Sequence, residues 1–159
     1  LNLPRGLQVE FRDEVQKITD EEGTELSSKR IYDRIMELYA NQPGARLAFV
    51  DHQSYPDPEH PALRSIAAEL WVRGEKKRIE GKGTGPIDGF VHALSIYLGI
   101  DLTVSDYSEH TLQHGSDGSA ICYMQVEHPK GKLYGVGINK NIVTSSLEAI
   151  VSAANRIVG

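Results

Sequence analysis

A glycine-rich segment that runs directly into an amphipathic helix constrains this chain more than any other feature. Glycine occupies every second position from Gly81 to Gly85, and Pro86 follows at a position typical of the first helical turn. Because glycine has no Cβ, another group can approach this backbone closely. Apolar residues then recur at helical spacing, at positions 87, 90, 91, 94 and 98. The pattern predicts a strand, a tight turn and a helix over 86–98, whose N-terminus would favour an anion.

The order of elements predicted around this turn occurs twice. Residues 46–98 and residues 101–158 each show three strand-like segments followed by an amphipathic helix. Aligning the two helices places Gly83 on Asn139, and asparagine tolerates left-handed backbone better than most residues. We therefore predict an α+β fold, a layered body of two pseudo-twofold-related strand–strand–strand–helix repeats. Since each three-stranded sheet would expose an apolar face, the two repeats, or two copies of the chain, must cover each other.

The boundaries of the strands follow from period-two alternation and from turn residues. Residues 55–61 are rich in proline and are predicted to form a loop, because proline cannot donate to a central ladder. Residues 73–76 are predicted to form a tight turn. The remaining segments are predicted as strands over 46–53, around 66–72, and over 77–81, 101–112, 119–127 and 132–138, and as a helix over 141–158.

Residues 1–42 are predicted to form two short amphipathic helices. Gly23 is expected to end the first helix, and Ser27 or Ser28 to cap the second. Two short helices bury little surface by themselves. We therefore expect them to pack on the rest of the chain, on a partner subunit or on an upstream domain.

A cluster of turn-forming residues at 41–44 marks a predicted domain boundary. It divides the chain into a helical linker, residues 1–42, and a second domain, residues 43–159. The chain begins at Leu1, which we interpret as the start of a fragment of a longer protein.

Composition and charge exclude several classes of function. A net charge of −5 argues against a nucleic-acid partner, which would require a concentrated basic face. The short basic run at 76–78 is flanked by Glu75 and Glu80 and is predicted to be a solvated strand edge. Cys122, the single cysteine, alternates with apolar residues and is predicted to lie in the core. With no internal disulfide and no apolar run as long as a membrane span, we expect a cytoplasmic protein without a membrane partner.

The familiar phosphate-binding and metal-binding patterns are not met. A dinucleotide-binding turn would require a third glycine where Asp88 stands, and an acidic residue there would repel a pyrophosphate. His110 and His114 are four residues apart but lie in a predicted strand and loop, so a structural role is favoured over metal binding. We predict neither a metal site nor a catalytic residue in this chain.

A site for a small amphipathic ligand is one of two interpretations of the region around Tyr107. Gly118 and Ala120 are small and would leave room beside Tyr107, and the glycine-rich turn could complete an enclosure. The alternative is a tight hairpin with a buried tyrosine. Pattern alone does not separate the two.

Five segments, in order along the chain, closely resemble the C-terminal regulatory, leucine-binding domain of 2-isopropylmalate synthase. They are residues 83–94, 106–110, 115–120, 135–138 and 142–156. Residues 6–26 look like the linker subdomain that precedes this domain in the longer enzymes.

The resemblance implies a homodimeric module that binds L-leucine near the dimer interface. Leucine would thereby inhibit a distant TIM-barrel active site, which carries a divalent metal and condenses acetyl-CoA with 2-oxoisovalerate in leucine biosynthesis. The barrel and its His-x-His metal motif have no counterpart in this sequence. We therefore expect the chain to need no cofactor and to be catalytically silent by itself.

The effector-binding residues that the resemblance implies come from the glycine-rich turn, the next two strands and the second glycine turn. They are Gly83, Gly85, Pro86, Ile87, Asp88, Val104, Tyr107, Thr111, Gly118, Ala120 and Ile138. The sequence departs from the family pattern at Thr84, where asparagine is frequent, and at Thr111 and Gly118, where alanine is common. The effector carboxylate would use amides at the start of the 86–98 helix. Its ammonium would use turn carbonyls or Asp88, and its isobutyl group Val104 and Ile138.

Three other interpretations compete with this one. The regulatory domain of citramalate synthase shares the layout and would sense isoleucine, although residues 106–110 and the helical linker favour the leucine enzyme. A structural dimerisation module without an effector is the second alternative. A self-contained enzyme is the third.

Overall fold

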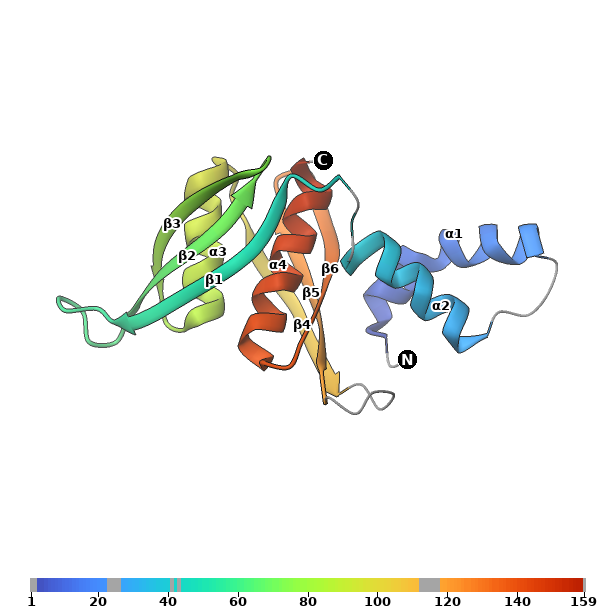
Figure 1. Ribbon diagram of the computed structural model, residues 1–159, viewed down its shortest axis with the longest axis horizontal. Helices are drawn as coiled ribbons and strands as arrows, with labels where there is room; N and C mark the ends of the chain where they lie inside the picture. Colours follow the sequence, from blue (N-terminus) through green and yellow to red (C-terminus); the bar gives the residue numbers. More distant parts are fainter. Residues whose placement is uncertain (1–2, 23–26, 41, 43, 112–117, 159) are drawn as a thin grey trace.

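The computed structural model describes residues 3–22, 27–40, 42, 44–111 and 118–158. Helices come first along the chain, followed by two units that each contain three strands and a helix (Figure 1). The elements are α1 (Arg5–Glu22), α2 (Ser28–Ile35), a π-helical turn η1 (Met36–Ala40), β1 (Leu47–Pro56), β2 (Arg64–Val72), β3 (Glu75–Gly83), α3 (Pro86–Leu98), β4 (Thr103–Thr111), β5 (Ala120–His128), β6 (Gly131–Asn139) and α4 (Ile142–Val158). The predicted α+β class and the predicted repeat are confirmed.

The two units match in residue spacing as well as in order. Equivalent elements begin 56 residues apart, at Arg64 and Ala120, at Glu75 and Gly131, and at Pro86 and Ile142. Strands β1-β2-β3 form one antiparallel sheet and β4-β5-β6 form another. The first strand of each sheet carries a bulge, between Phe49 and Asp51 in β1 and, one position earlier in the repeat, between Val104 and Asp106 in β4. Strand β2 pairs with β3 in the same register as β5 with β6, so the duplication extends to the pairing of these strands. Strand β4 is shifted by one residue on β5 relative to β1 on β2.

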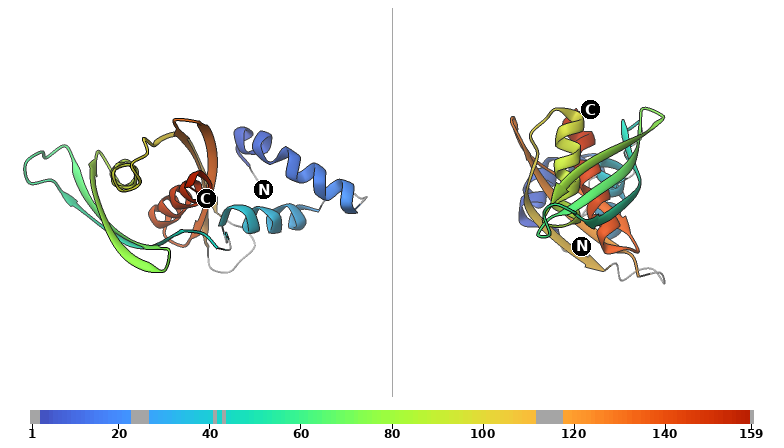
Figure 2. Two further views of the ribbon diagram at one scale, coloured as in Figure 1. Left: turned by 90° about the horizontal axis from the view of Figure 1, so that it is seen from above. Right: turned by 90° about the vertical axis from the view of Figure 1, so that its left-hand side faces the viewer.

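The two helices α3 and α4 lie between the two sheets (Figure 2, left). Helix α3 packs on β2 and β3, whereas α4 packs on β5 and β6 and also reaches β1. Their apolar faces join the inner faces of both sheets in one core cluster, which includes Ile66, Leu70, Phe90, Leu94, Met124, Leu147 and Ile150, all buried. The two repeats therefore cover each other within one chain, the first of the two predicted arrangements.

The glycines at the end of each third strand are explained by the packing of the helix that follows. A Cβ on Gly81 would lie 2.6 Å from the backbone nitrogen of Ala93 in α3. A Cβ on Gly137 would meet the backbone of α4 at Ser145 and Ala149. Only glycine allows strand and helix to approach so closely. The group that approaches these two glycines is the helix of the same repeat.

Helices α1 and α2 cover the outer face of the second sheet (Figure 2). This linker cluster consists of Leu7, Phe11, Ile35 and Tyr39 against Ile121, Tyr123, Tyr134 and Val136, all buried. At the corresponding positions the first sheet carries Ser65, Ala67, Arg78 and Glu80. The second sheet therefore offers the apolar outer face on which the linker helices pack, as one of our expectations had it.

Several boundaries differ from the prediction. Strand β1 continues to Pro56, which pairs with Arg64, so the predicted loop over 55–61 was wrong at its start. Pro56 is tolerated because β1 is an edge strand. The turn after β2 contains only Arg73 and Gly74, with φ of 51° and 83°, and β3 therefore begins at Glu75 rather than at residue 77.

At the start of the second helix, the Ser27 side chain accepts a hydrogen bond from the backbone N–H of Arg30, as expected of a cap. The predicted stop at Gly23, most of the loop over 113–118 and His114 lie outside the described residues, as do Asn41 and Pro43 of the predicted boundary. Within the described part of the chain, every helix is too short or too polar to cross a bilayer.

Candidate functional site

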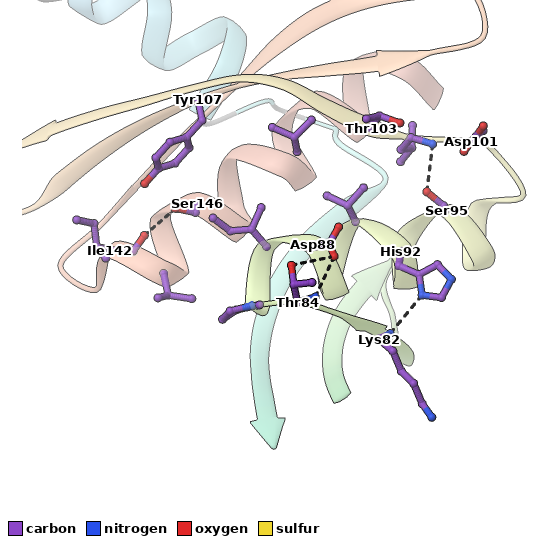
Figure 3. Close-up of a pocket in the computed structure, with 17 residues that line it drawn as sticks. Lys82, Thr84, Asp88, His92, Ser95, Asp101, Thr103, Tyr107, Ile142 and Ser146 are labelled. Carbon is purple, nitrogen blue, oxygen red and sulfur yellow. Dashed lines mark hydrogen bonds between the residues drawn. The ribbon is translucent and has the colours of Figure 1, made fainter. Parts of the chain in front are cut away.

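A partly open cavity of about 740 Å³ lies between the first turns of α3 and α4 and the strand β4 (Figure 3). Strand β4 is an edge strand of the second sheet, and α4 packs over the other two strands, β5 and β6. The inner face of β4 is therefore left open. The lining consists of Lys82, Thr84, Gly85, Pro86, Ile87, Asp88, Val91, His92, Ser95, Asp101, Leu102, Thr103, Val104, Tyr107, Ile142, Val143 and Ser146.

The cavity brings together six of the eleven effector-binding residues that the resemblance implied. They are Gly85, Pro86, Ile87, Asp88, Val104 and Tyr107. Gly83 is buried just behind the turn, where a Cβ would lie 2.6 Å from the Asp88 carboxylate. It shapes the turn and does not line the cavity.

The other four residues lie elsewhere. Thr111 and Ala120 are cross-strand partners at one end of the β4–β5 pair, and Gly118 precedes β5. Ile138 packs against the linker cluster and lines a separate cavity beside η1. Its neighbour Gly137 faces α4, and alternate residues of a strand point to opposite faces. That alternation turns Ile138 toward the outer face of its sheet.

The start of α3 is an open helix N-terminus. Gly85 is the N-cap and supplies no side-chain hydrogen bond, and its carbonyl accepts the first helical bond from Gly89 at 2.9 Å. At the equivalent place in α4, Asn141 Oδ1 accepts a hydrogen bond from the Thr144 N–H at 3.0 Å. The first turn of a helix leaves N–H groups without intrahelical acceptors. Of the two helices, α3 is thus the one whose first turn remains available to an anion.

Asp88 holds the glycine-rich turn in place. Its Oδ2 atom accepts hydrogen bonds from the backbone N–H of Thr84 at 3.0 Å and from the Thr84 hydroxyl at 3.4 Å (Figure 3). The carboxylate also stands in the first turn of α3, where the helix dipole stabilises negative charge. Asp88 therefore organises the turn in addition to presenting charge at the cavity.

Tyr107 extends from β4 toward the first turn of α4 (Figure 3). Its hydroxyl donates a hydrogen bond to Glu109. Burial, with the Glu109 hydrogen bond second, raises the pKa of Tyr107 to about 12. The phenol therefore stays neutral at physiological pH and offers the cavity an amphipathic wall.

Several lining residues were missed by the sequence prediction. Ser146 and Ile142 contribute the α4 side, where the Ser146 hydroxyl donates to the Ile142 carbonyl at 2.9 Å. His92 lies on α3 and its Nδ1 accepts a hydrogen bond from the Lys82 N–H at 3.2 Å (Figure 3). The repeat could have predicted Ile142 as a lining residue, because Ile142 is the counterpart of Pro86 in the second unit. No pattern along the chain indicated that the two helix starts would face one cavity.

Among the described residues, no group of three or more His, Cys, Asp or Glu side chains could hold a metal ion. The His110 ring packs 5.5 Å from the ring of Tyr123, and burial lowers its pKa. Cys122 lies in the core cluster, as predicted, and burial raises the pKa of its thiol to about 11. A buried, protonated thiol is a poor nucleophile.

The chain is similar to known proteins along most of its length. Residues 25–158 match the family model described as LeuA allosteric (dimerisation) domain. The chain is 68% identical over 157 residues to a 2-isopropylmalate synthase of Rhizobium meliloti and 65% identical over 157 residues to that of Agrobacterium fabrum. It is 40% identical over 158 residues to that of Rhodospirillum rubrum. Each alignment covers 99% of this chain but only 28% of the relative.

Proposed function

Because this chain belongs to the LeuA allosteric (dimerisation) domain family, we propose that it senses L-leucine for a 2-isopropylmalate synthase. Binding of leucine to this domain inhibits the synthase by feedback. The full protein condenses acetyl-CoA with 2-oxoisovalerate in a TIM-barrel domain upstream of residue 1, and it acts in the cytoplasm. The barrel holds the divalent metal and all catalytic groups. This chain contributes regulation and dimerisation.

The observation that carries the proposal is the cavity at the uncapped start of α3. A free amino acid presents a carboxylate, an ammonium group and a side chain within a few ångströms of one another. The open amides of Ile87 and Asp88 suit the carboxylate, because they carry no side-chain cap and lie at the positive end of the helix dipole. Pro86 has no N–H and only shapes the turn.

The remaining walls of the cavity suit the other parts of leucine. The second carboxylate oxygen of Asp88 and the carbonyls of the glycine-rich turn are acceptors for the ammonium group. Ile87, Val104 and Val143 form an apolar lining for a branched side chain. All these groups belong to one cavity, so each of the three chemical features of leucine meets a complementary wall.

The cavity is partly open, and its volume lies in the upper part of the range of about 300–1,000 Å³ usual for small-ligand sites. Strand β4, which contributes to the lining, is an edge strand of its sheet in the described part of the chain, and an edge strand presents backbone groups to which a second chain can pair. A second copy of the chain placed there would complete the enclosure. The proposed homodimer and the proposed effector site therefore support each other.

Isothermal titration of the chain with leucine, isoleucine and valine tests the proposal. We expect the strongest heat with leucine. A preference for isoleucine would indicate the regulatory domain of a citramalate synthase. The absence of heat with all three amino acids would indicate a structural dimerisation module without an effector.

A matched pair of variants locates the site. Ile87→Ala shortens a side chain that lines the cavity, and we expect it to weaken leucine binding by roughly tenfold, a typical effect of losing a branched contact. Ile96→Ala shortens a side chain on the same helix that is 63% exposed and lies outside this cavity. Equal losses in both variants would place the effector somewhere else.

A further inference from the structure

Strand β4 joins the cavity to the linker helices through two consecutive residues. Tyr107 lines the cavity on the inner face of the second sheet. The residue before it, Asp106, faces the opposite side, where its Oδ2 accepts a hydrogen bond from the Tyr134 hydroxyl at 2.5 Å. A bulge between Val104 and Asp106 interrupts the ladder at this point. Because Asp106 and Tyr107 are consecutive, a backbone shift at Tyr107 also moves Asp106.

Tyr134 in turn positions the start of α1. Its backbone N–H donates to Glu10 Oε2 at 3.0 Å, and its carbonyl accepts from the Arg156 guanidinium, which also forms an ion pair with Glu10. Its ring lies so close to Gly6 that a Cβ there would be 2.7 Å from the tyrosine oxygen. The hydroxyl, N–H and carbonyl of this one residue thus connect β4, α1 and α4.

The contact between the linker helices and the second sheet leaves two buried hydroxyls unsatisfied. Within the described part of the chain, neither Ser108 Oγ nor Tyr123 Oη has a hydrogen-bond partner. The two residues are cross-strand partners on the outer face, and Tyr123 is fully buried in the linker cluster. Burying a hydroxyl without a partner is unfavourable. A displacement of α1 and α2 that admitted water would give both groups a hydrogen-bond partner. The packed position of the helices on the sheet, which we call the seated position, therefore competes with a displaced position.

We propose that the Asp106–Tyr134 hydrogen bond couples the effector cavity to the position of α1 on the second sheet. An effector that packs against Val104 and Tyr107 holds β4, keeps Asp106 on Tyr134 and stabilises the seated helix. Without an effector, β4 is free to relax and the displaced position gains population. Because coupling requires only that the ligand bind one arrangement more tightly, no large motion is needed. This inference rests on the proposed leucine-sensing function.

The test uses the full-length synthase that contains this chain. Tyr134→Phe removes the hydroxyl and keeps the ring against Gly6. We expect it to bind leucine but to retain at least about half of its turnover at saturating leucine, where the wild type is inhibited. Saturation removes any effect of altered affinity. Tyr97→Phe, which removes the hydroxyl of a tyrosine that is 41% exposed on α3, serves as the control and should be inhibited as the wild type is.

Asp106 provides a second, independent pair. Asp106→Ala removes the acceptor and should uncouple leucine binding from inhibition. Asp106→Asn keeps an acceptor oxygen and should restore most of the inhibition. A structural readout accompanies the kinetics: leucine should slow amide hydrogen exchange in α1 of the wild type and of Tyr97→Phe, but not in Tyr134→Phe or Asp106→Ala.

The outcomes separate this inference from the proposed function. Leucine binding with full inhibition of both Tyr134→Phe and Asp106→Ala would overturn the coupling and leave leucine sensing intact. If leucine did not change the rate of amide hydrogen exchange in α1 of the wild type, the coupling would also be overturned and leucine sensing left intact. Absence of leucine binding to the wild-type enzyme would overturn the proposed function, and the coupling with it.

Discussion

At the scale of single residues, the glycine-rich turn contains positions with different physical requirements. A Cβ on Gly83 would lie 2.5 Å from the Gly89 nitrogen and 2.6 Å from the Asp88 carboxylate, so this position must be glycine for the turn to close. A Cβ on Gly85 would meet no heavy atom within 4 Å, and its φ of −162° is open to any residue. Gly83 therefore serves the fold, whereas Gly85 faces the cavity.

The two positions should respond differently to the same substitution. Gly83→Ala should destabilise the chain by about 1–3 kcal/mol, because backbone has to move to admit the methyl group. Gly85→Ala should change stability by less than about 0.5 kcal/mol but weaken leucine binding, since its methyl group would stand where the ligand approaches. Urea unfolding and leucine titration of both variants check this. A stable Gly83→Ala protein would show that the turn adjusts at low cost.

At the scale of elements, the loop between β1 and β2 is fastened to β3 by one carboxylate. Asp57 Oδ1 accepts hydrogen bonds from the N–H groups of Glu59 and His60 at 2.8 and 3.1 Å, and Oδ2 forms an ion pair with Lys82 at 2.6 Å. The Asp57 side chain is fully buried. The Lys82 hydrogen bond, with the loop amides, lowers the pKa of Asp57 from 3.8 to about 2. The ion pair holds the loop to the strand that leads into the cavity.

The loop should therefore lose its anchor in acid. Since the pKa of Asp57 is lower in the folded chain than in the unfolded chain, its contribution to stability is complete above about pH 4.5 and is lost as the pH falls toward 2. Asp57→Asn keeps one acceptor oxygen for the loop amides but has no titrating group. The difference in unfolding free energy between wild type and Asp57→Asn should shrink between pH 4.5 and 2. A constant difference over that range would contradict the anchoring role of the charge.

At the scale of the whole molecule, two hydrophobic clusters lie on opposite faces of the second sheet. The core cluster occupies the space between the sheets, and the linker cluster lies under α1, α2 and η1. The linker cluster is smaller and is bordered by the polar contacts of Glu10, Arg156 and Tyr134. Such an interface opens more readily than a continuous apolar core. The linker helices are therefore the part of the molecule suited to change position.

Two phenylalanine truncations test this division. Phe11→Ala and Phe90→Ala each remove a ring that is at most 2% exposed, one from each cluster, and each should cost about 3–5 kcal/mol. Phe11→Ala should speed amide exchange in α1, α2 and η1 and leave α3 and α4 protected. Phe90→Ala should lower the unfolding temperature of the whole domain. Faster exchange in α3 and α4 of Phe11→Ala would show that the chain unfolds as one unit.

Much of this architecture was readable along the chain. The start of α3 at Pro86 follows from the restricted φ of proline, and its end at Leu98 from apolar spacing. The repeat follows from glycine and asparagine at equivalent turns. These features are local, because each depends on residues within one or two helical turns or strand pairs of one another. The family resemblance rests on the same local motifs.

Only the tertiary structure decided which surfaces meet. It showed that Gly81 makes room for α3 and that Gly83 makes room for the turn that follows it. It also showed that Ile138 faces the linker cluster and that Ser146 lines the cavity. The uncovered inner face of β4 and the Asp106–Tyr134 contact likewise depend on how separate elements pack. Sequence by itself determined the elements and their duplication, because periodicity and backbone preference act over a few residues. The cavity and its connection to α1 were decided in three dimensions, because they join side chains that are distant along the chain and whose facing depends on the packing of two sheets around two helices.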